Sequence, residues 1–150
     1  MKKNIYLLII MLMIITGCNE KNAIKEEKVL TCTKAFEESS LKMFQTASIN
    51  FIDNKINDIK SNILVTLPDE YKSSIDTFTK SFEDSYTKQY EGNNHVKVDI
   101  LKKSDKEISI DILLDYKNMT DEEKSSSGFN GSEDYTINKT TLEKNGYTCE

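Results

Sequence analysis

The side chains with the most distinctive chemistry are three cysteines, Cys18, Cys32 and Cys149, and a single histidine, His95. A thiol can form a disulfide or bind a metal, and an imidazole can act as a general base. A general base needs an orienting acid and a nucleophile within hydrogen-bond reach, and the residues around His95 supply neither. Cys32, Cys149 and His95 are also too few to complete a zinc site. We therefore expect an exposed structural histidine, and we predict no catalytic residue, no metal site and no cofactor.

Cys18 follows a segment that is organised like a signal peptide. Two lysines precede 11 consecutive apolar residues, 5–15, and the small residue Gly17 comes directly before Cys18. The apolar run is too short to span a membrane, which takes about 20 residues. Residues 14–18, Ile-Ile-Thr-Gly-Cys, resemble the lipobox of bacterial lipoproteins. The resemblance implies that residues 1–17 are removed and that Cys18 carries a diacylglyceryl thioether. The alternative is an ordinary secretory signal with a chance cysteine.

The remaining chain divides into a tether and one domain. Residues 18–27 begin at the lipidated cysteine and continue as a polar, charged stretch without periodicity, which is typical of a flexible linker. Nine flexible residues reach roughly 15 to 18 Å. Residues 28–150 have the length of a single domain.

Cys32 and Cys149 lie near opposite ends of the predicted domain. Export to an oxidising compartment favours a disulfide between them, and two free buried thiols are the alternative. A bridge closing most of the chain into one loop is worth about 5 kcal/mol in the chain-entropy model. Such a staple suits a chain whose apolar content is low.

The charge of the chain limits its partners. The full sequence has a net charge of −5, and all of its basic residues are lysines. A surface without arginine lacks the bidentate phosphate contacts of nucleic-acid-binding proteins, so we predict no nucleic-acid partner. An acidic surface does not adhere to anionic lipid. Membrane attachment therefore depends on the acyl chains at Cys18. The predicted partner is the membrane lipid into which these chains insert.

Alternating apolar residues predict an antiparallel sheet. We expect strands over 29–36, 41–51, 59–65, 96–100 and 108–116, and a last short strand at 147–149. Residues 96–116 form the clearest hairpin, and residues 53–55 form a turn. Asp111 and Asp115 fall on the face opposite the isoleucine row, where Lys97 or Lys103 can pair with them.

Two helices complete the prediction. Pro68 starts the first helix, and an apolar stripe follows at helical spacing as far as Tyr90: Tyr71, Ile75, Phe78, Phe82 and Tyr86. Packing on the sheet is favoured for this stripe over a ligand or lipid surface. Residues 136–145 form a short helix that Gly146 ends. The fold class is therefore α+β, mainly antiparallel, with the order β-β-β-α-β-β-α-β.

Residues 118–134 are polar, acidic and rich in serine, so we expect a long surface loop there. Oxygen-rich loops can hold Ca²⁺, but the acidic residues around Gly128 and Gly131 do not follow the alternating EF-hand spacing. A solvated acidic loop is the favoured interpretation.

The order of elements, the lipobox and the C-terminal sequence Leu-Glu-Lys-Asn-Gly-Tyr at 142–147 resemble the YehR-like family of small bacterial lipoproteins, a domain of unknown function. The resemblance covers roughly residues 28–150. Residues 115–117, Asp-Tyr-Lys, are similar to the ending of a family strand, whereas residues 53–56 lack the glycine of the family's Gly-Asp-Lys-Val type of turn. The resemblance implies a fold and a location on the extracytoplasmic side of the cell membrane. It implies no activity.

Three functions are compatible with these features. The favoured one is a non-enzymatic module that binds a protein, a peptide or a polymer of the cell envelope. The second is a carrier of a small molecule or a metal ion. An envelope hydrolase has the least support, because the sequence contains no Gly-x-Ser-x-Gly motif or comparable catalytic pattern.

Overall fold

A computed structural model describes residues 26–38, 40–129 and 131–150 of the chain. Cys18, the predicted signal peptide and most of the predicted tether lie outside the described residues. Six antiparallel strands form one sheet in the order β4-β5-β3-β2-β1-β6. Their bounds are β1 Glu27–Glu38, β2 Leu41–Ile52, β3 Lys55–Thr66, β4 Val96–Lys102, β5 Glu107–Leu114 and β6 Thr148–Cys149.

The first strand begins two residues before the strand predicted over 29–36. The backbone N–H of Glu26 donates to Asp53 Oδ1 (3.2 Å), and the N–H of Asp53 donates to the Glu26 carbonyl (2.9 Å). These two bonds fix the chain beside the β2–β3 turn, so β1 starts at Glu27.

The β2–β3 turn forms without glycine. Asp53 and Asn54 adopt left-handed conformations with φ of 53° and 60°. Asp and Asn tolerate this region better than other non-glycine residues, and two such residues in succession suit a tight hairpin. Close to this turn, the β2–β3 pairing shifts its register between Asn50 and Phe51. This shift changes the alternation of β3, so that Ile56 and Ile59 are both buried although they are three residues apart.

The helices occupy the predicted positions. A 3₁₀ helix, η1 (Asp69–Ser74), follows Pro68 and leads into α2 (Ile75–Gln89). The short helix α4 (Tyr135–Lys144) begins where the Asp134 side chain accepts from the Ile137 N–H (2.9 Å). Gly146, at φ 85°, lets the chain turn from α4 into β6.

The region expected to be a long loop, residues 118–134, contains a helix instead. A 3₁₀ turn, η2 (Tyr116–Asn118), precedes α3 (Asp121–Ser126). Thr120 and Glu123 form a reciprocal capping box: Thr120 N–H donates to Glu123 Oε2 (2.8 Å), and Glu123 N–H donates to Thr120 Oγ1 (3.2 Å). This spacing is a sequence signal for a helix start that outweighs the polar composition of the segment. The strand predicted as far as Tyr116 ends at Leu114, and Tyr116 is buried in η2.

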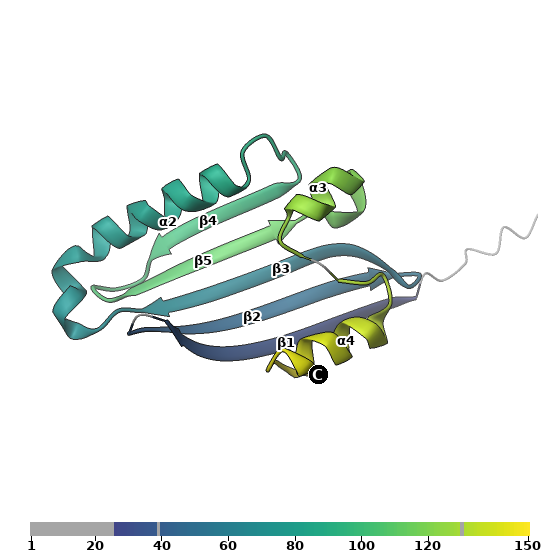
Figure 1. Ribbon diagram of the computed structural model, residues 1–150, viewed down its shortest axis with the longest axis horizontal. Coiled ribbons are helices and arrows are strands. Elements are labelled where there is room, and N and C mark those ends of the chain that lie inside the picture. The colour runs from purple at the N-terminus through teal and green to yellow at the C-terminus, as the bar shows by residue number, and fades with distance from the viewer. Residues whose placement is uncertain (1–25, 39, 130) are drawn as a thin grey trace, which may run out of the picture.

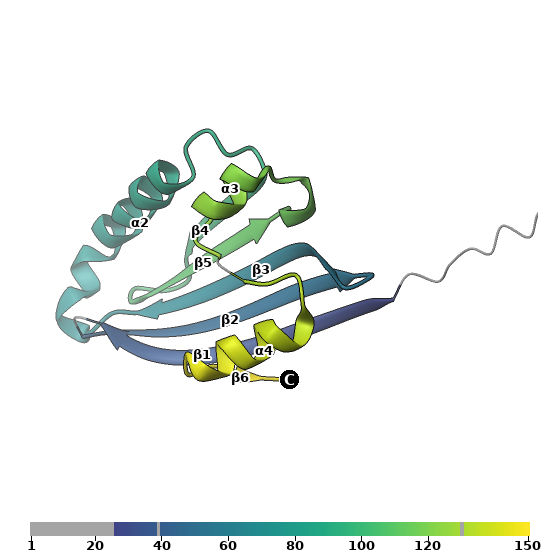
Figure 2. The ribbon, with the colours of Figure 1, turned by 45° about the vertical axis from the view of Figure 1, so that its right-hand side comes forward.

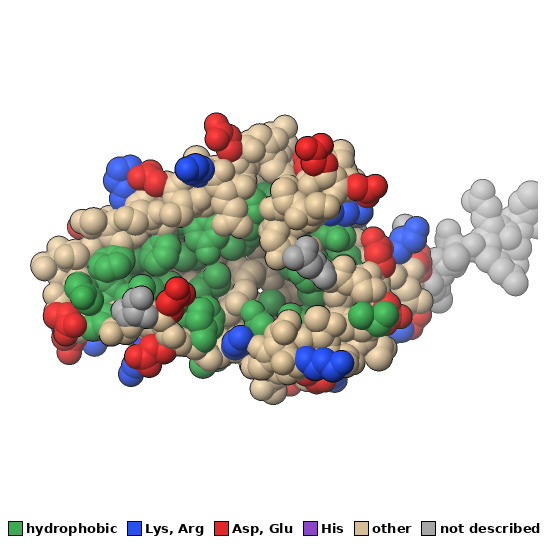
Figure 3. All heavy atoms as spheres, viewed as in Figure 1, with side chains coloured by type: hydrophobic (Ala, Val, Ile, Leu, Met, Phe, Trp, Pro, Cys, Tyr) green, Lys and Arg blue, Asp and Glu red, His purple; other side chains and the backbone are tan. Residues whose placement is uncertain are grey.

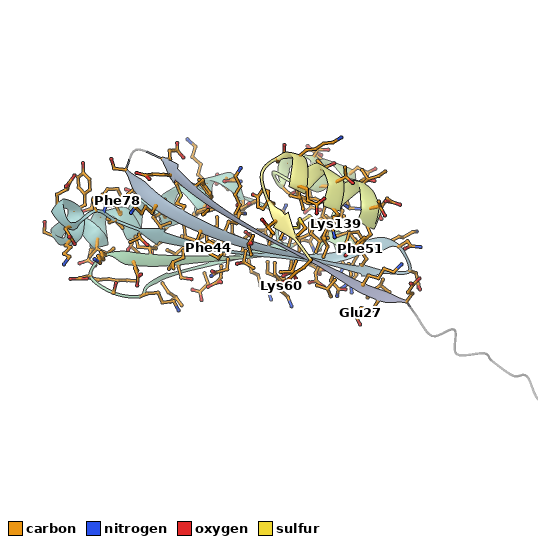
Figure 4. The ribbon with its side chains drawn as sticks, turned by 90° about the horizontal axis from the view of Figure 1, so that it is seen from below. Glu27, Phe44, Phe51, Lys60, Phe78 and Lys139 are labelled. Atoms are coloured by element: carbon orange, nitrogen blue, oxygen red, sulfur yellow. A yellow bond between two sulfur atoms is a disulfide. The ribbon has the colours of Figure 1, made fainter. Side chains whose placement is uncertain are left out.

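The helices α2 and α4 lie on the same side of the sheet (Figure 1, Figure 2). Seen edge-on in Figure 4, Phe51 and Phe78 lie on the helix side and Lys60 lies on the other side. We call these sides the inner face and the outer face. The α+β class and the mainly antiparallel sheet are confirmed, and the predicted element order is reproduced apart from α3 and the 3₁₀ turns. No helix among the described residues is long and apolar enough to cross a membrane.

Candidate functional site: a cleft on the inner face

Cys32 and Cys149 are directly opposite each other in the β1–β6 pairing and form a disulfide with an S–S distance of 2.07 Å. Two backbone hydrogen bonds between Thr31 and Glu150, at 3.1 and 2.9 Å, continue this pairing. Cys32 is buried. The predicted pairing is confirmed, and it brings the C-terminal tail beside the first strand.

Tyr147 connects this tail to the middle of the sheet. Its hydroxyl donates to Gln45 Oε1 (2.8 Å), and Gln45 Nε2 donates to Ser61 Oγ (2.9 Å). The three side chains cross β2 and β3 on the inner face as a row of uncharged polar groups. Burial raises the pKa of the Tyr147 hydroxyl, so the phenol stays protonated and remains a donor at neutral pH.

Asn138 fixes the segment that precedes α4. Its side chain is buried, and its Nδ2 donates to the carbonyls of Ser132 and Asp134, the latter at 3.0 Å. Its Oδ1 accepts from the Ser132 N–H (3.1 Å). A Cβ on Gly131 would collide with the Phe129 ring and with Asn138 Oδ1, so the backbone approaches this side chain as only glycine permits.

An elongated depression, which we call the inner cleft, lies between α2 and α4. One part is a cavity of about 450 Å³ whose floor comes from β2, β3 and β5 and whose walls come from Tyr90 after α2, residues 127–129, Gly131 and α4. A second cavity of about 450 Å³ continues toward η1 and shares Ile63 with the first. Figure 3 shows apolar side chains along this face between the two helices and a hollow near its centre.

The lining of the inner cleft is nearly uncharged. The first cavity contains apolar side chains of Ile49, Ile63 and Leu142 together with uncharged polar groups such as Ser61 and Asn138. Among the residues that the structure describes, tyrosine is its one ionisable type, and Glu38 is the one charged residue of the second cavity. Apolar walls with a few hydrogen-bonding groups and a volume of this size are typical of small-molecule sites.

The aromatic stripe on α2 serves the core and also borders the cleft. Ile75 is buried, and Phe78, Phe82 and Tyr86 are half-buried against the sheet, which confirms the packing prediction for these four residues. Tyr71, which lies in η1, is exposed and meets Phe78 edge-on. Phe82 and Tyr86 also line the second cavity, and Tyr90 lines the first. Burial raises the pKa of the Tyr86 and Tyr90 hydroxyls.

The other residues singled out in the sequence do not meet at this cleft. His95 precedes β4 and borders a depression of about 380 Å³ with Asp58, Asp115 and Lys97. In the described part of the chain, the imidazole makes no hydrogen bond and no three metal-ligating side chains come together. The predicted ion pairs of Asp111 and Asp115 with lysines do not form, because these carboxylates accept from amide groups nearer to them. Asn62 Nδ2 donates to Asp111 (2.7 Å), and Asn118 Nδ2 donates to Asp115 (2.8 Å).

The disulfide could be predicted from the sequence, but the inner cleft could not. Gln45, Ser61 and Asn138 carry no motif. The β2–β3 pairing brings Gln45 and Ser61 together, and Asn138 joins them at the cavity only because α4 packs beside β1. One sequence signal could have indicated the cleft. Each of these polar residues occupies a position that faces the core, in a strand or helix where the neighbouring core-facing positions are apolar.

No protein-family model matches this chain, and no curated protein matches it. A solved structure is similar in fold, the "NMR structure of the protein from Streptococcus pneumoniae TIGR4". The two chains are 13% identical with a TM-score of 0.57, and the similarity covers 82% of this chain and 86% of the other. At this identity the comparison establishes a shared fold alone.

Proposed function

We propose that this protein is a lipid-anchored, non-enzymatic binding module on the extracytoplasmic side of a bacterial membrane, and that its inner cleft binds a neutral, largely apolar molecule. The observation that carries the proposal is the cavity of about 450 Å³, with apolar walls and the uncharged polar row of Tyr147, Gln45 and Ser61. An apolar ligand gains from leaving water, and this row can orient one polar end of it.

The absence of charge in the first cavity decides the class of ligand. A buried carboxylate or phosphate of a ligand needs a cationic partner or several donors, because burial of an unpaired charge is costly. Among the described residues the lining of this cavity includes no lysine, and Lys34, beside Asn145 and Tyr147, already donates to the Asn145 carbonyl (2.8 Å). A neutral ligand is therefore favoured over the metal ion that we considered as an alternative cargo.

The location rests on the lipobox-like sequence that ends at Cys18 and on the resemblance to the YehR-like family. Metabolic labelling of bacteria with an alkyne analogue of palmitate tests it. The wild type is expected to incorporate the label and to fractionate with membranes, and Cys18→Ala is expected to lose both properties. Equal labelling of the two proteins would contradict the anchor.

The cleft is tested with N-phenyl-1-naphthylamine, a neutral probe whose fluorescence rises in apolar surroundings. Ala47 lines the first cavity, and its neighbour Ser48 lies on the outer face. We expect Ala47→Trp to fill the cavity and weaken probe binding at least about tenfold, or about 1.4 kcal/mol. The matched variant Ser48→Trp is expected to bind like the wild type. Equal binding by both variants would overturn the cleft as the ligand site.

A further inference from the structure

The edge strand β4 is paired on one side only within the described chain. Its partner is β5, in a continuous register from Val96↔Leu114 to Lys102↔Ile108. The His95 carbonyl accepts from the Asp115 N–H (2.9 Å), and the Lys103 N–H donates to the Glu107 carbonyl (2.8 Å). The odd-numbered residues therefore direct their backbone groups toward β5.

In an antiparallel ladder the direction of the backbone groups alternates from residue to residue. The N–H and C=O groups of the even-numbered residues Val96, Val98, Ile100 and Lys102 consequently face the free edge. The strand has neither a proline nor a bulge over these seven residues, which are two of the devices that block pairing at natural sheet edges. The edge is thus a regular template for another strand.

The helix α2 runs along this strand (Figure 1). A groove, which we call the edge groove, lies beside them. The groove has a volume of about 830 Å³ and lies between the C-terminal half of α2, the 92–94 turn and β4. The stacked rings of Tyr86 and Tyr90, with centroids 6.3 Å apart, belong to its helix wall. It shares Tyr90 with the cavity beside α4 and Tyr86 with the second cavity, and it also contains Asp99 and Val98 of the sheet edge.

The charges of the edge groove are mostly negative. Glu83, Glu91 and Asp99 line it and form no ion pair among the described residues, while Lys88 is its one lysine. A fourth carboxylate, Asp84, pairs with Lys80 (3.1 Å). Carboxylates on both the helix wall and the strand favour a cationic occupant over an anionic one.

We propose that the edge groove binds an extended peptide segment with basic side chains, which adds to β4 as a further antiparallel or parallel strand. The outward backbone groups of β4 supply the hydrogen bonds, as in other recognition by strand addition. The carboxylates of the groove pair with lysine or arginine side chains of the peptide. The outward groups of β4 and the carboxylates that the proposal uses do not line the inner cleft, so either proposal can fail without the other.

The first test follows backbone amides by hydrogen exchange in NMR spectra of the folded protein. The probe is a fluorescent ten-residue peptide in which lysine alternates with valine. Adding it is expected to slow exchange at the outward amides of Val98 and Ile100 and to leave Lys97 and Asp99 unchanged, because these already bond to β5. Protection confined to other strands, or no protection at saturating peptide, would overturn the proposal.

The second test changes the donors at the edge. Val98→Pro removes an outward N–H without removing a bond to β5, and edge strands tolerate proline at such positions. It is expected to weaken peptide binding at least about tenfold relative to Val98→Ala, which keeps the N–H. If Val98→Pro does not fold, methylating one alternating set of peptide amides must weaken binding while methylating the other set does not. Equal effects of the two sets would contradict strand addition.

The third test concerns charge. The double variant Glu83→Gln/Glu91→Gln is expected to weaken binding and to flatten its dependence on salt, since screening acts on these pairs. The control Glu37→Gln/Glu143→Gln makes the same change in net charge at exposed residues away from the groove. A peptide with glutamate in place of lysine is expected not to bind. Equal binding of the acidic and basic peptides would overturn the assigned partner class.

Discussion

The two ends of the inner face are covered by helices that are held in different ways. At the end we call closed, α4 packs over the core cluster that contains Leu30, Ile49 and Phe51, and the disulfide follows directly after it. At the end we call open, α2 packs over the cluster that contains Val65, Ile108 and Ile110. No disulfide crosses the open end in the described chain.

The difference follows from the side chains of the helices. Only Asn138 is buried in α4. Tyr135 and Leu142 pack half-buried on the core and Ile137 is 55% exposed, so this helix brings fewer apolar side chains to the sheet than α2 does. By contrast, α2 has the aromatic stripe, which packs on the sheet through half-buried rings. The disulfide compensates for the smaller apolar face of α4, because it lowers the conformational entropy of the unfolded chain and so stabilises the fold without further contacts.

Breaking the disulfide should have the largest effect on this comparison. Cys32→Ser opens a loop of 117 residues, and the loss in unfolding free energy is expected to approach about 5 kcal/mol. Thermal unfolding under oxidising conditions measures it, and wild type treated with a reductant should melt like the variant. Equal melting of untreated wild type and variant would mean that the bridge does not stabilise the fold.

A matched pair of aromatic deletions compares burial at the two ends. Phe51 is 1% exposed and its ring meets Tyr135 edge-on at 5.5 Å. Phe51→Ala is expected to cost about 3–5 kcal/mol, the range for buried phenylalanine. Phe82→Ala should cost roughly half as much, because Phe82 is half-buried. Denaturant unfolding measures both free-energy losses. A larger loss for Phe82→Ala would contradict the more complete burial of Phe51 at the closed end.

The polar anchor of the closed end should have a smaller effect. Asn138→Leu removes the side-chain bonds to Ser132 and Asp134 and leaves the part-buried backbone N–H and carbonyl of Ser132 without these partners. The expected cost is about 1–3 kcal/mol in chemical denaturation. Thr140→Leu, at an exposed position of the same helix, serves as the control. Similar stabilities of the two variants would contradict a stabilising role of the Asn138 hydrogen bonds at the closed end.

The smallest expected effect is a pH dependence at α3, which also belongs to the closed end. The hydrogen bond from the Thr120 backbone N–H lowers the pKa of Glu123 below its usual value of 4.5. The stabilisation is therefore present above pH 4.5 and is lost as the pH falls through the folded-state pKa. NMR titration of the Glu123 carboxyl measures it. Glu123→Gln should flatten this part of the stability profile, and an unshifted titration would contradict the capping box in solution.

The sequence located most elements because their patterns are local. Alternation at 41–51 and at 108–114 reflects one buried face of a strand, and the spacing of the stripe from Tyr71 to Tyr86 reflects one face of a helix. It missed α3, although Thr120 and Glu123 already had the spacing of a capping box. The general composition of a segment was a weaker guide there than one pair of residues.

The fold class, the two main helices and the pairing of Cys32 with Cys149 could be predicted from the amino-acid order, since each depends on local periodicity or on which thiols are present. The place of β5 between β4 and β3, which makes β4 an edge strand with α2 beside it, emerged from the folded chain. The folded chain also determines the inner cleft, because the cleft is the space that α2 and α4 leave uncovered. Such features depend on how separate elements pack, and no local pattern encodes the distance between two helices on one sheet.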